Sequence, residues 1–259
     1  MDPKHFTISM FPTVALRGPE LAALLDVFEK EPALAPTHWG HDERAKTKYD
    51  RQELMALAPP EGARFSELWL HRKPAPAYSG SFSTKTGLFC FLNFDFADSL
   101  PRKYWETFFA ASDRIADVAR PRYGVTHMRV PSPWPWKTET ERIHRWMSYS
   151  TQPSPVRVNP NGPIGLGHVT YFGSQLVDLF GEAFLAQAPL TVEKTAWGGL
   201  KLSLPSSLQE LPFPEQLERW RQAMTYLGTA RVLATPVFHD DARTVSFQPG
   251  EAWLKRPRH

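Results

Sequence analysis

The chain has 259 residues, and its shares of hydrophobic (42%) and charged (22%) residues are close to those of average globular proteins. Its 30 basic and 27 acidic residues are mixed along the chain and leave a net charge of +3, so no basic block indicates nucleic-acid binding. Cys90 is the single cysteine, which excludes an intramolecular disulfide and a cysteine-based zinc site. The sequence contains neither a signal-peptide h-region nor a run of about 18 apolar residues. We therefore expect a cytoplasmic protein without membrane contact.

The spacing of apolar residues predicts the elements of the first half. These are a strand at 6–11, a helix after Pro19, an irregular segment with a short helix at 37–57, strands at 64–72, 78–84 and 87–94, a helix between Pro101 and Pro121, a strand at 123–130 and a helix at 139–149. The run 88–94 is apolar almost throughout, which is typical of a central strand covered on both faces. The three strands from 64 to 94 are expected to form an antiparallel meander.

A segment rich in proline separates the two halves. Residues 151–163 contain four prolines together with Asn159, Asn161 and Gly162, a composition typical of a linker or a long surface crossing. The second half is predicted to contain strands at 167–172, 190–195, 197–204, 232–238 and 244–254, and helices at 174–180 and 214–227. This order predicts an α+β fold, with helices packed against a mostly antiparallel sheet. It forms one domain over 1–259 or two lobes, 1–150 and 163–259, joined by residues 151–162.

The motifs that could carry catalysis or bind a metal are weak. His38 and His41, with Asp42 or Glu43 as a third ligand, could hold a metal, but two histidines three residues apart are more typical of a solvated loop. Other candidates are interpreted as structural. Cys90 is expected to be buried, and His168 is expected to bond to a backbone group. The carboxylate pairs Asp95/Asp98 and Asp240/Asp241 are expected to lie at turns. The glycines Gly162, Gly165 and Gly167 do not match a dinucleotide-binding pattern. No catalytic residue, metal or cofactor is therefore predicted.

The segment 131–136 has an unusual composition, Pro-Ser-Pro-Trp-Pro-Trp. Rigid aromatic side chains near arginines are typical of protein interface hot spots. We therefore predict that Trp134, Trp136, Arg142 and Arg145 bind a partner, whereas Trp105, Trp146, Trp197 and Trp220 belong to the fold. One alternative is that the two tryptophans cover the end of the sheet as a lid. Another is that they stack on nucleic-acid bases, which the small charge surplus disfavours.

Three short motifs in this order resemble the immunity protein 52 family of bacterial polymorphic toxin systems. They are His38-Trp39-Gly40 followed by Asp42-Glu43 and Tyr49, then residues 167–172 (Gly-His-Val-Thr-Tyr-Phe), then Trp197-Gly198-Gly199. The last motif also has a physical reason, because glycine beside a tryptophan allows close approach or a positive φ.

The resemblance implies an α+β protein that protects the producing cell by binding a cognate toxin. Toxins of these systems often carry a restriction-endonuclease-like domain and are often exported by type VI secretion. The implied partner is a toxin effector protein, and the implied role is inhibition by binding, not catalysis. A slightly basic chain is unusual for a nuclease inhibitor that mimics nucleic acid with carboxylates. The alternatives are a small metal-dependent hydrolase that uses His38 and His41, and a nucleic-acid-binding accessory protein.

Overall fold

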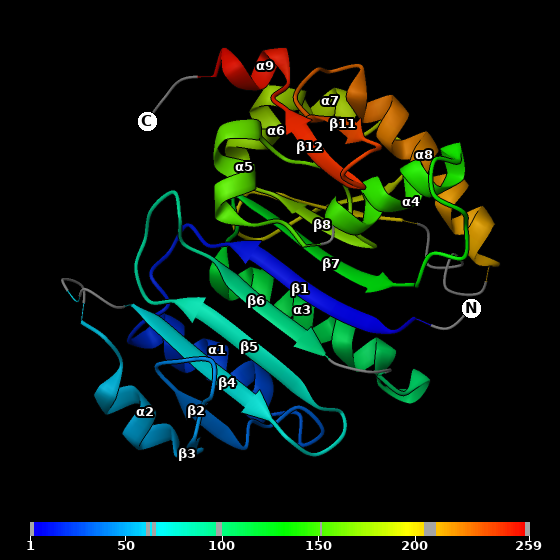
Figure 1. Cartoon of the computed structure of the whole chain (residues 1–259). Coiled ribbons are helices and arrows are strands. Elements are labelled where there is room, and N and C mark those ends of the chain that lie inside the picture. Colours follow the sequence, from blue (N-terminus) through cyan, green and yellow to red (C-terminus); the bar gives the residue numbers. More distant parts are fainter. Residues whose placement is uncertain are drawn as a thin grey trace.

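In the computed structural model, residues 3–60, 63, 66–96, 100–150, 152–204 and 211–256 are described, and they form the predicted α+β fold (Figure 1). One antiparallel sheet of ten strands runs through the molecule. Its order is β3 (Thr47–Lys48), β2 (His38–Gly40), β4 (Glu67–Arg72), β5 (Tyr78–Ser83), β6 (Leu92–Phe96), β1 (His5–Phe11), β7 (Tyr123–Arg129), β8 (Val169–Phe172), β10 (Leu200–Ser203) and β9 (Thr191–Lys194). The strands β11 (Thr235–His239) and β12 (Thr244–Gln248) form a separate hairpin.

Two helices cover one face of the half-sheet from β4 to β1. These are α1 (Pro19–Glu29) and α3 (Trp105–Ala119), which is preceded by the short 3-10 helix η1 (Arg102–Tyr104), while α2 (Arg51–Leu57) lies beside them. The alternation of side chains along β1 places Phe6, Ile8 and Met10 in this core, because successive residues of a strand point to opposite faces. Pro19 lies in the first turn of α1, where its missing N–H group costs nothing.

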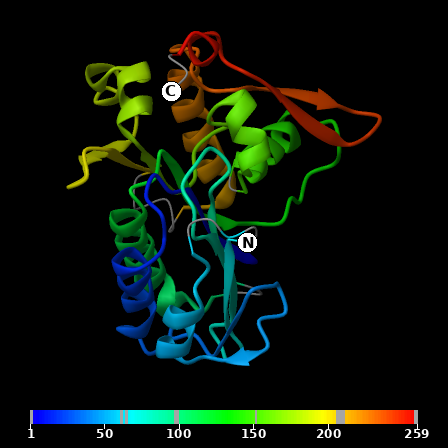
Figure 2. The same ribbon diagram turned by 90° about the vertical axis from the view of Figure 1, so that its left-hand side faces the viewer.

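The remaining helices belong to the half of the molecule built on β7, β8 and β10. They are α4 (Glu139–Ser150), α5 (Pro155–Asn161), α6 (Ser174–Phe180), α7 (Glu182–Leu185), α8 (Phe213–Gly228) and α9 (Glu251–Leu254). Figure 2 shows α4 and α8 on the side of the sheet opposite α1 and α3. The face of α8 that carries Leu217, Trp220 and Met224 is buried in the second core, as its helical spacing predicts.

The helices α1 and α3 form a layer on one face of the half-sheet β4–β5–β6–β1. Among the described residues no helix lies over its second face (Figures 1 and 2). That face carries alternating polar side chains, including Ser79, Asn93 and Asp95. The sheet is therefore apolar toward α1 and α3 and polar on its open side, which is typical of an antiparallel sheet with one solvated face.

The structure corrects the prediction of a central strand at 87–94. Strand β6 begins at Leu92, and the preceding residues form the turn after β5, in which Leu88 and Phe89 are 56% and 66% exposed. The polar residues Asn93 and Asp95 alternate with the apolar ones, so β6 is not covered by apolar packing on both faces. Cys90 is buried, as predicted, although it lies in this turn and not within the strand.

The second half contains α7, which was not predicted, and differs from the prediction near its C-terminal end. Residues 251–254 form the short helix α9 instead of continuing a strand, and the predicted closing strands form the separate hairpin β11–β12. The proline-rich segment contains α5, and β7 and β8 on either side of this segment pair in the same sheet. Whether the chain forms one domain or two lobes stays a prediction. Within the described part of the chain, every helix is too short or too polar to span a lipid bilayer.

Candidate functional site

The four residues predicted to bind a partner lie together. Trp134 and Trp136 belong to the segment between β7 and α4, and Arg142 and Arg145 lie one turn apart on α4. The guanidinium of Arg145 lies 4.0 Å from the centre of the Trp136 ring, within cation–π distance. We refer to these four residues as the aromatic–arginine cluster.

Three members of the aromatic–arginine cluster contact the turn of the hairpin β11–β12. Arg142 forms an ion pair with Asp240 at 2.9 Å, and Trp136 Nε1 donates a hydrogen bond to the Asp240 carbonyl at 3.2 Å. Arg145 Nη1 donates to the carbonyl of Arg243 at 3.2 Å. The cluster therefore holds the hairpin against α4, and its role in binding a partner stays a prediction.

Trp134 is packed differently from Trp136. Its ring stacks on Phe213 at the start of α8, with centroids 5.8 Å apart and planes 27° apart, and it also contacts His144. These are the contacts expected if Trp134 covers part of the core. Trp136, Arg142 and Arg145 are the members of the cluster that contact the hairpin.

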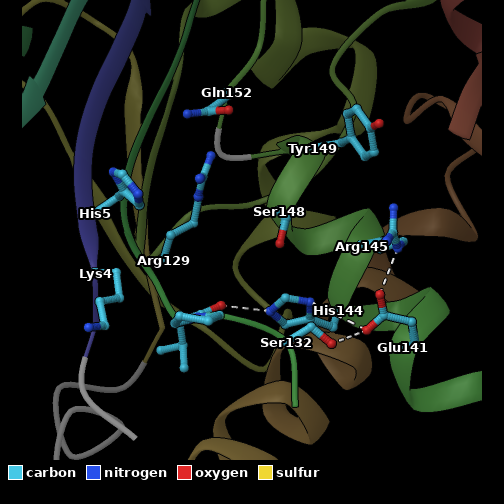
Figure 3. Close-up of a pocket in the computed structure, with 12 residues that line it drawn as sticks. Lys4, His5, Arg129, Ser132, Glu141, His144, Arg145, Ser148, Tyr149 and Gln152 are labelled. Carbon is cyan, nitrogen blue, oxygen red and sulfur yellow. Dashed lines mark hydrogen bonds and ion pairs between the residues drawn. The ribbon is translucent and has the colours of Figure 1, made fainter. Parts of the chain in front are cut away.

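A cavity of about 600 Å³ opens beside the cluster, between α4 and the ends of β1 and β7 (Figure 3). We call it the α4 pocket. Lys4, His5 and Arg129 lie on its strand side, and Glu141, His144 and Arg145 lie on its helix side (Figure 3). The remaining lining residues are Val130, Pro131, Ser132, Ser148, Tyr149 and Gln152.

Glu141 is the centre of the helix side of the α4 pocket. Its carboxylate is 5% exposed and accepts hydrogen bonds from Ser132 Oγ and from Arg145 Nε, the latter at 2.6 Å. Arg145 is four residues after Glu141, so the two side chains meet on one face of α4. Thr138 caps the start of this helix, because its hydroxyl accepts a hydrogen bond from the Glu141 N–H at 3.2 Å. The paired charges make a buried carboxylate tolerable at this position.

The pocket contains a serine, a histidine and a glutamate, but they do not form a catalytic relay. The Ser132 hydroxyl donates a hydrogen bond to the Glu141 carboxylate. His144 Nε2 forms a hydrogen bond with the Val130 carbonyl at 2.9 Å. His144 Nδ1 lies 4.0 Å from the Glu141 carboxylate, outside hydrogen-bond distance. Burial lowers the pKa of His144, which favours the neutral ring. A serine nucleophile needs a base within hydrogen-bond reach, and His144 is not placed to act as that base for Ser132.

The strand side of the α4 pocket is cationic. His5 and Arg129 are direct partners across β1 and β7, and the Lys4 N–H donates to the Arg129 carbonyl at 2.8 Å. His5 lies 3.8 Å from Asp95 on β6. Neither Lys4 nor Arg129 forms an ion pair with any residue that the structure describes. No motif in the sequence marks these three residues.

A second cavity, of about 570 Å³, lies on the open face of the half-sheet and shares His5 with the α4 pocket. Its lining includes Trp69, Ser79, Asn93 and Asp95, which belong to three neighbouring strands. Ser79 Oγ lies 3.0 Å from His71 Nε2 in the same polar row. The two cavities therefore meet at His5.

The residues proposed for the alternative metal site at His38 and His41 do not form a group of ligands. His38 Nε2 lies 3.1 Å from the ammonium of Lys73, and burial and that charge lower the His38 pKa. Asp42 is paired with Arg44, whose guanidinium lowers the Asp42 pKa to about 2, and His41 packs against the Trp39 ring. Over the described ranges, no three His, Cys, Asp or Glu side chains form a group that could hold a metal ion.

The other histidine and carboxylate candidates have structural contacts. His168 bonds to the backbone N–H of Met128 at 3.4 Å, which confirms the predicted backbone contact. The structure adds His127, whose Nδ1 lies 2.8 Å from His168 Nδ1 in the core. Asp240 and Asp241 lie in the turn of the hairpin, as predicted. Asp95 lies within β6 and not at a turn, and Asp98 is outside the described residues.

The motif Trp197-Gly198-Gly199 forms the turn between β9 and β10. Gly198 has a φ of +86°, which favours glycine. A Cβ atom on Gly199 would lie 2.1 Å from the Trp197 ring, so this glycine allows the ring to cover it. Both roles expected from the sequence are confirmed.

Comparison with known proteins finds a likeness in structure. No family model matches the sequence, and no curated protein is detectably similar to it. The structure is similar to that of the T6SS protein PA0821 of Pseudomonas aeruginosa, with a TM-score of 0.55 and 14% sequence identity. The match covers 88% of this chain and 74% of that chain. What the two proteins share is the fold. Membership of the immunity protein 52 family stays a prediction.

Proposed function

We propose that this chain is an immunity protein, which binds a cognate toxin effector and neutralises it in the producing cell. The observation that carries the proposal is the fold shared with a T6SS protein over 88% of the chain. The three family-like motifs described above point to the same class of system. In this proposal the toxin is a nuclease with a restriction-endonuclease-like domain, and the protein acts in the cytoplasm.

The geometry of the site supports binding over catalysis. The α4 pocket holds Ser132, His144 and Glu141 without the hydrogen bonds of a nucleophile and its base. The same region has rigid aromatic side chains and arginines, which are enriched at protein interfaces. The proposed activity is therefore stoichiometric inhibition.

Coexpression tests this proposal directly. The protein product of the neighbouring gene is produced in a host cell with and without this chain, and cell survival and co-purification are measured. We expect survival and a stable complex only when both proteins are present. Continued killing together with the absence of a complex would refute the proposed function.

The aromatic–arginine cluster provides the first test of the binding surface. Trp136→Ala should weaken the complex with the toxin by about 1–4 kcal/mol, as expected for a hot-spot residue. Trp220 is fully buried in the second core, so Trp220→Ala should instead lower the free energy of unfolding by about 3–5 kcal/mol. Calorimetric titration measures the first effect and urea denaturation the second. Unchanged toxin affinity in the Trp136 variant would place the interface elsewhere.

A further inference from the structure

The α4 pocket concentrates positive charge at one corner of the sheet. Lys4 precedes β1, His5 begins it and Arg129 ends β7, and the antiparallel register places His5 and Arg129 directly opposite each other. Figure 3 shows these three side chains on the same side of the pocket. Cationic side chains that face each other across a strand pair destabilise the sheet when both are charged.

No acidic side chain on the helix side compensates this charge. Glu141 is already bonded to Arg145 and Ser132, and Asp95 lies beside His5 at 3.8 Å. Lys4 and Arg129 have no ion-pair partner in the part of the chain that the structure describes. Burial is the main cause that lowers the pKa of the neighbouring His127 and His144, and the charge of Arg129 adds to this effect.

The size and lining of the pocket match an extended ligand better than a single ion. Its volume is about 600 Å³, and Val130, Pro131 and Tyr149 add apolar and aromatic surface next to the cations. Gln152 adds an amide that can donate and accept hydrogen bonds. A guanidinium pairs with a carboxylate through two parallel hydrogen bonds, while an ammonium adds a second charge contact.

We infer that the α4 pocket binds an acidic segment of a partner protein, with Arg129 and Lys4 pairing with its carboxylates. The argument for this occupant is charge complementarity, because two unpaired cations line a cavity that is large enough for several side chains. Identification of the partner as the toxin rests on the proposed function. The pocket itself can be tested without the toxin.

The first experiment uses a glutamate-rich peptide as the probe and a glutamine-rich peptide of the same length as its neutral counterpart. Both are titrated into the full chain at low salt, and binding is followed by NMR chemical shifts and calorimetry. We expect the glutamate peptide alone to bind and to shift signals of residues lining the pocket. Arg129→Gln and Lys4→Gln should each weaken this binding about tenfold or more, since each removes a charge-assisted contact.

Two control variants each replace an arginine or a lysine that lies outside the α4 pocket. Arg114 is exposed on α3, on the opposite face of the sheet, and Lys48 is exposed on the edge strand β3. Arg114→Gln and Lys48→Gln should leave peptide binding unchanged. Equal losses in all four variants would mean that only net charge matters and would overturn the inference. Binding of inorganic phosphate or of an oligonucleotide in place of the glutamate peptide would also overturn it.

The second experiment measures association with the toxin of the neighbouring gene. If the wild type binds that toxin and Arg129→Gln weakens the complex, the acidic segment belongs to the toxin. If the toxin binds the wild type and the pocket variants equally and the peptide does not bind, the inference fails while the proposed function stands. If the peptide binds as expected but the toxin does not associate, the proposed function fails while the pocket assignment stands.

Discussion

Glu141 is a carboxylate that the fold keeps almost out of contact with water. Its side chain is 5% exposed, and an unpaired charge at that depth would cost several kcal/mol. Arg145 and Ser132 compensate this cost by donating hydrogen bonds, and Arg145 in turn contacts Trp136 and the hairpin. One buried residue on α4 therefore organises both the pocket and the aromatic–arginine cluster.

Replacement of Glu141 tests this role. Glu141→Gln keeps the size of the side chain but removes the charge that pairs with Arg145, so the free energy of unfolding should fall by about 1–3 kcal/mol. Glu139 is exposed in the first turn of the same helix, and Glu139→Gln should change stability by less than about 0.5 kcal/mol. Urea denaturation of both variants measures the difference. Equal effects at the two positions would show that the Glu141 contacts do not stabilise the fold.

The buried pair His127 and His168 predicts how stability depends on pH. Burial lowers the pKa of His168 to about 4 and that of His127 well below its usual value of 6.5. In the unfolded chain both rings take up a proton near pH 6.5, so between that pH and about 4 the unfolded state binds more protons. The free energy of unfolding should therefore decrease as the pH falls through this window, by up to about 1.4 kcal/mol per pH unit for each histidine.

The pH prediction is checked by urea denaturation at pH 7.5, 6 and 5. His168→Gln keeps a polar side chain but cannot take up the proton, so its stability should fall less steeply than that of the wild type. His239 is exposed on the hairpin, and His239→Gln should retain the wild-type slope. A wild-type slope in the His168 variant would contradict this account.

The hairpin β11–β12 depends on α4 for its position. It pairs with no strand of the ten-stranded sheet, and its turn is held by Arg142 and Trp136 through Asp240. The Arg142–Asp240 ion pair is partly exposed, so it is expected to contribute about 0.2–1 kcal/mol. Such a contact can fix a local element without deciding the stability of the whole fold.

Arg142→Gln should therefore loosen the hairpin selectively. Amide hydrogen exchange at 235–248 should become faster, while exchange in the central strands β1 and β7 stays the same. The ion pair Arg221–Glu218 on α8 has similar exposure, and Arg221→Gln serves as the matched control that should leave the hairpin unchanged. Unchanged exchange of the hairpin in the Arg142 variant would show that other contacts hold it.

Elements with a single clear periodicity could be predicted from the sequence. Helices α3 and α8 begin near prolines and repeat apolar residues at helical spacing, and both lie where the pattern places them. The apolar run at 87–94 misled the prediction, because hydrophobicity alone does not distinguish a buried strand from an exposed turn. Leu88 and Phe89 lie in that turn, which only the pairing of β5 with β6 reveals.

The candidate site was predictable only where its residues are close in sequence. Trp136, Arg142 and Arg145 fall within ten residues, and the structure keeps them together. Lys4 and Arg129 are 125 residues apart in the sequence, and they are brought together only by the pairing of β1 with β7. Strand register is set by tertiary packing, so the cationic corner has no signal in a single sequence.

The two larger hydrophobic cores share central strands of the ten-stranded sheet. Strand β7 contributes Met128 to the core under α1 and α3, and Tyr123 and Val125 to the core under α8. Strand β7 also pairs with β1 on one side and β8 on the other. Because β7 cannot unfold without breaking contacts in both cores, the two halves are expected to unfold together.

Two cavity-forming substitutions, one in each core, test this coupling. Leu24 on α1 and Leu217 on α8 are both buried, and replacing either with alanine should cost about 2–5 kcal/mol. In a coupled molecule each substitution should speed global amide exchange in β6 and in β10 alike, although the cavity lies in one half only. If Leu24→Ala affects β6 alone and Leu217→Ala affects β10 alone, the chain behaves as two lobes.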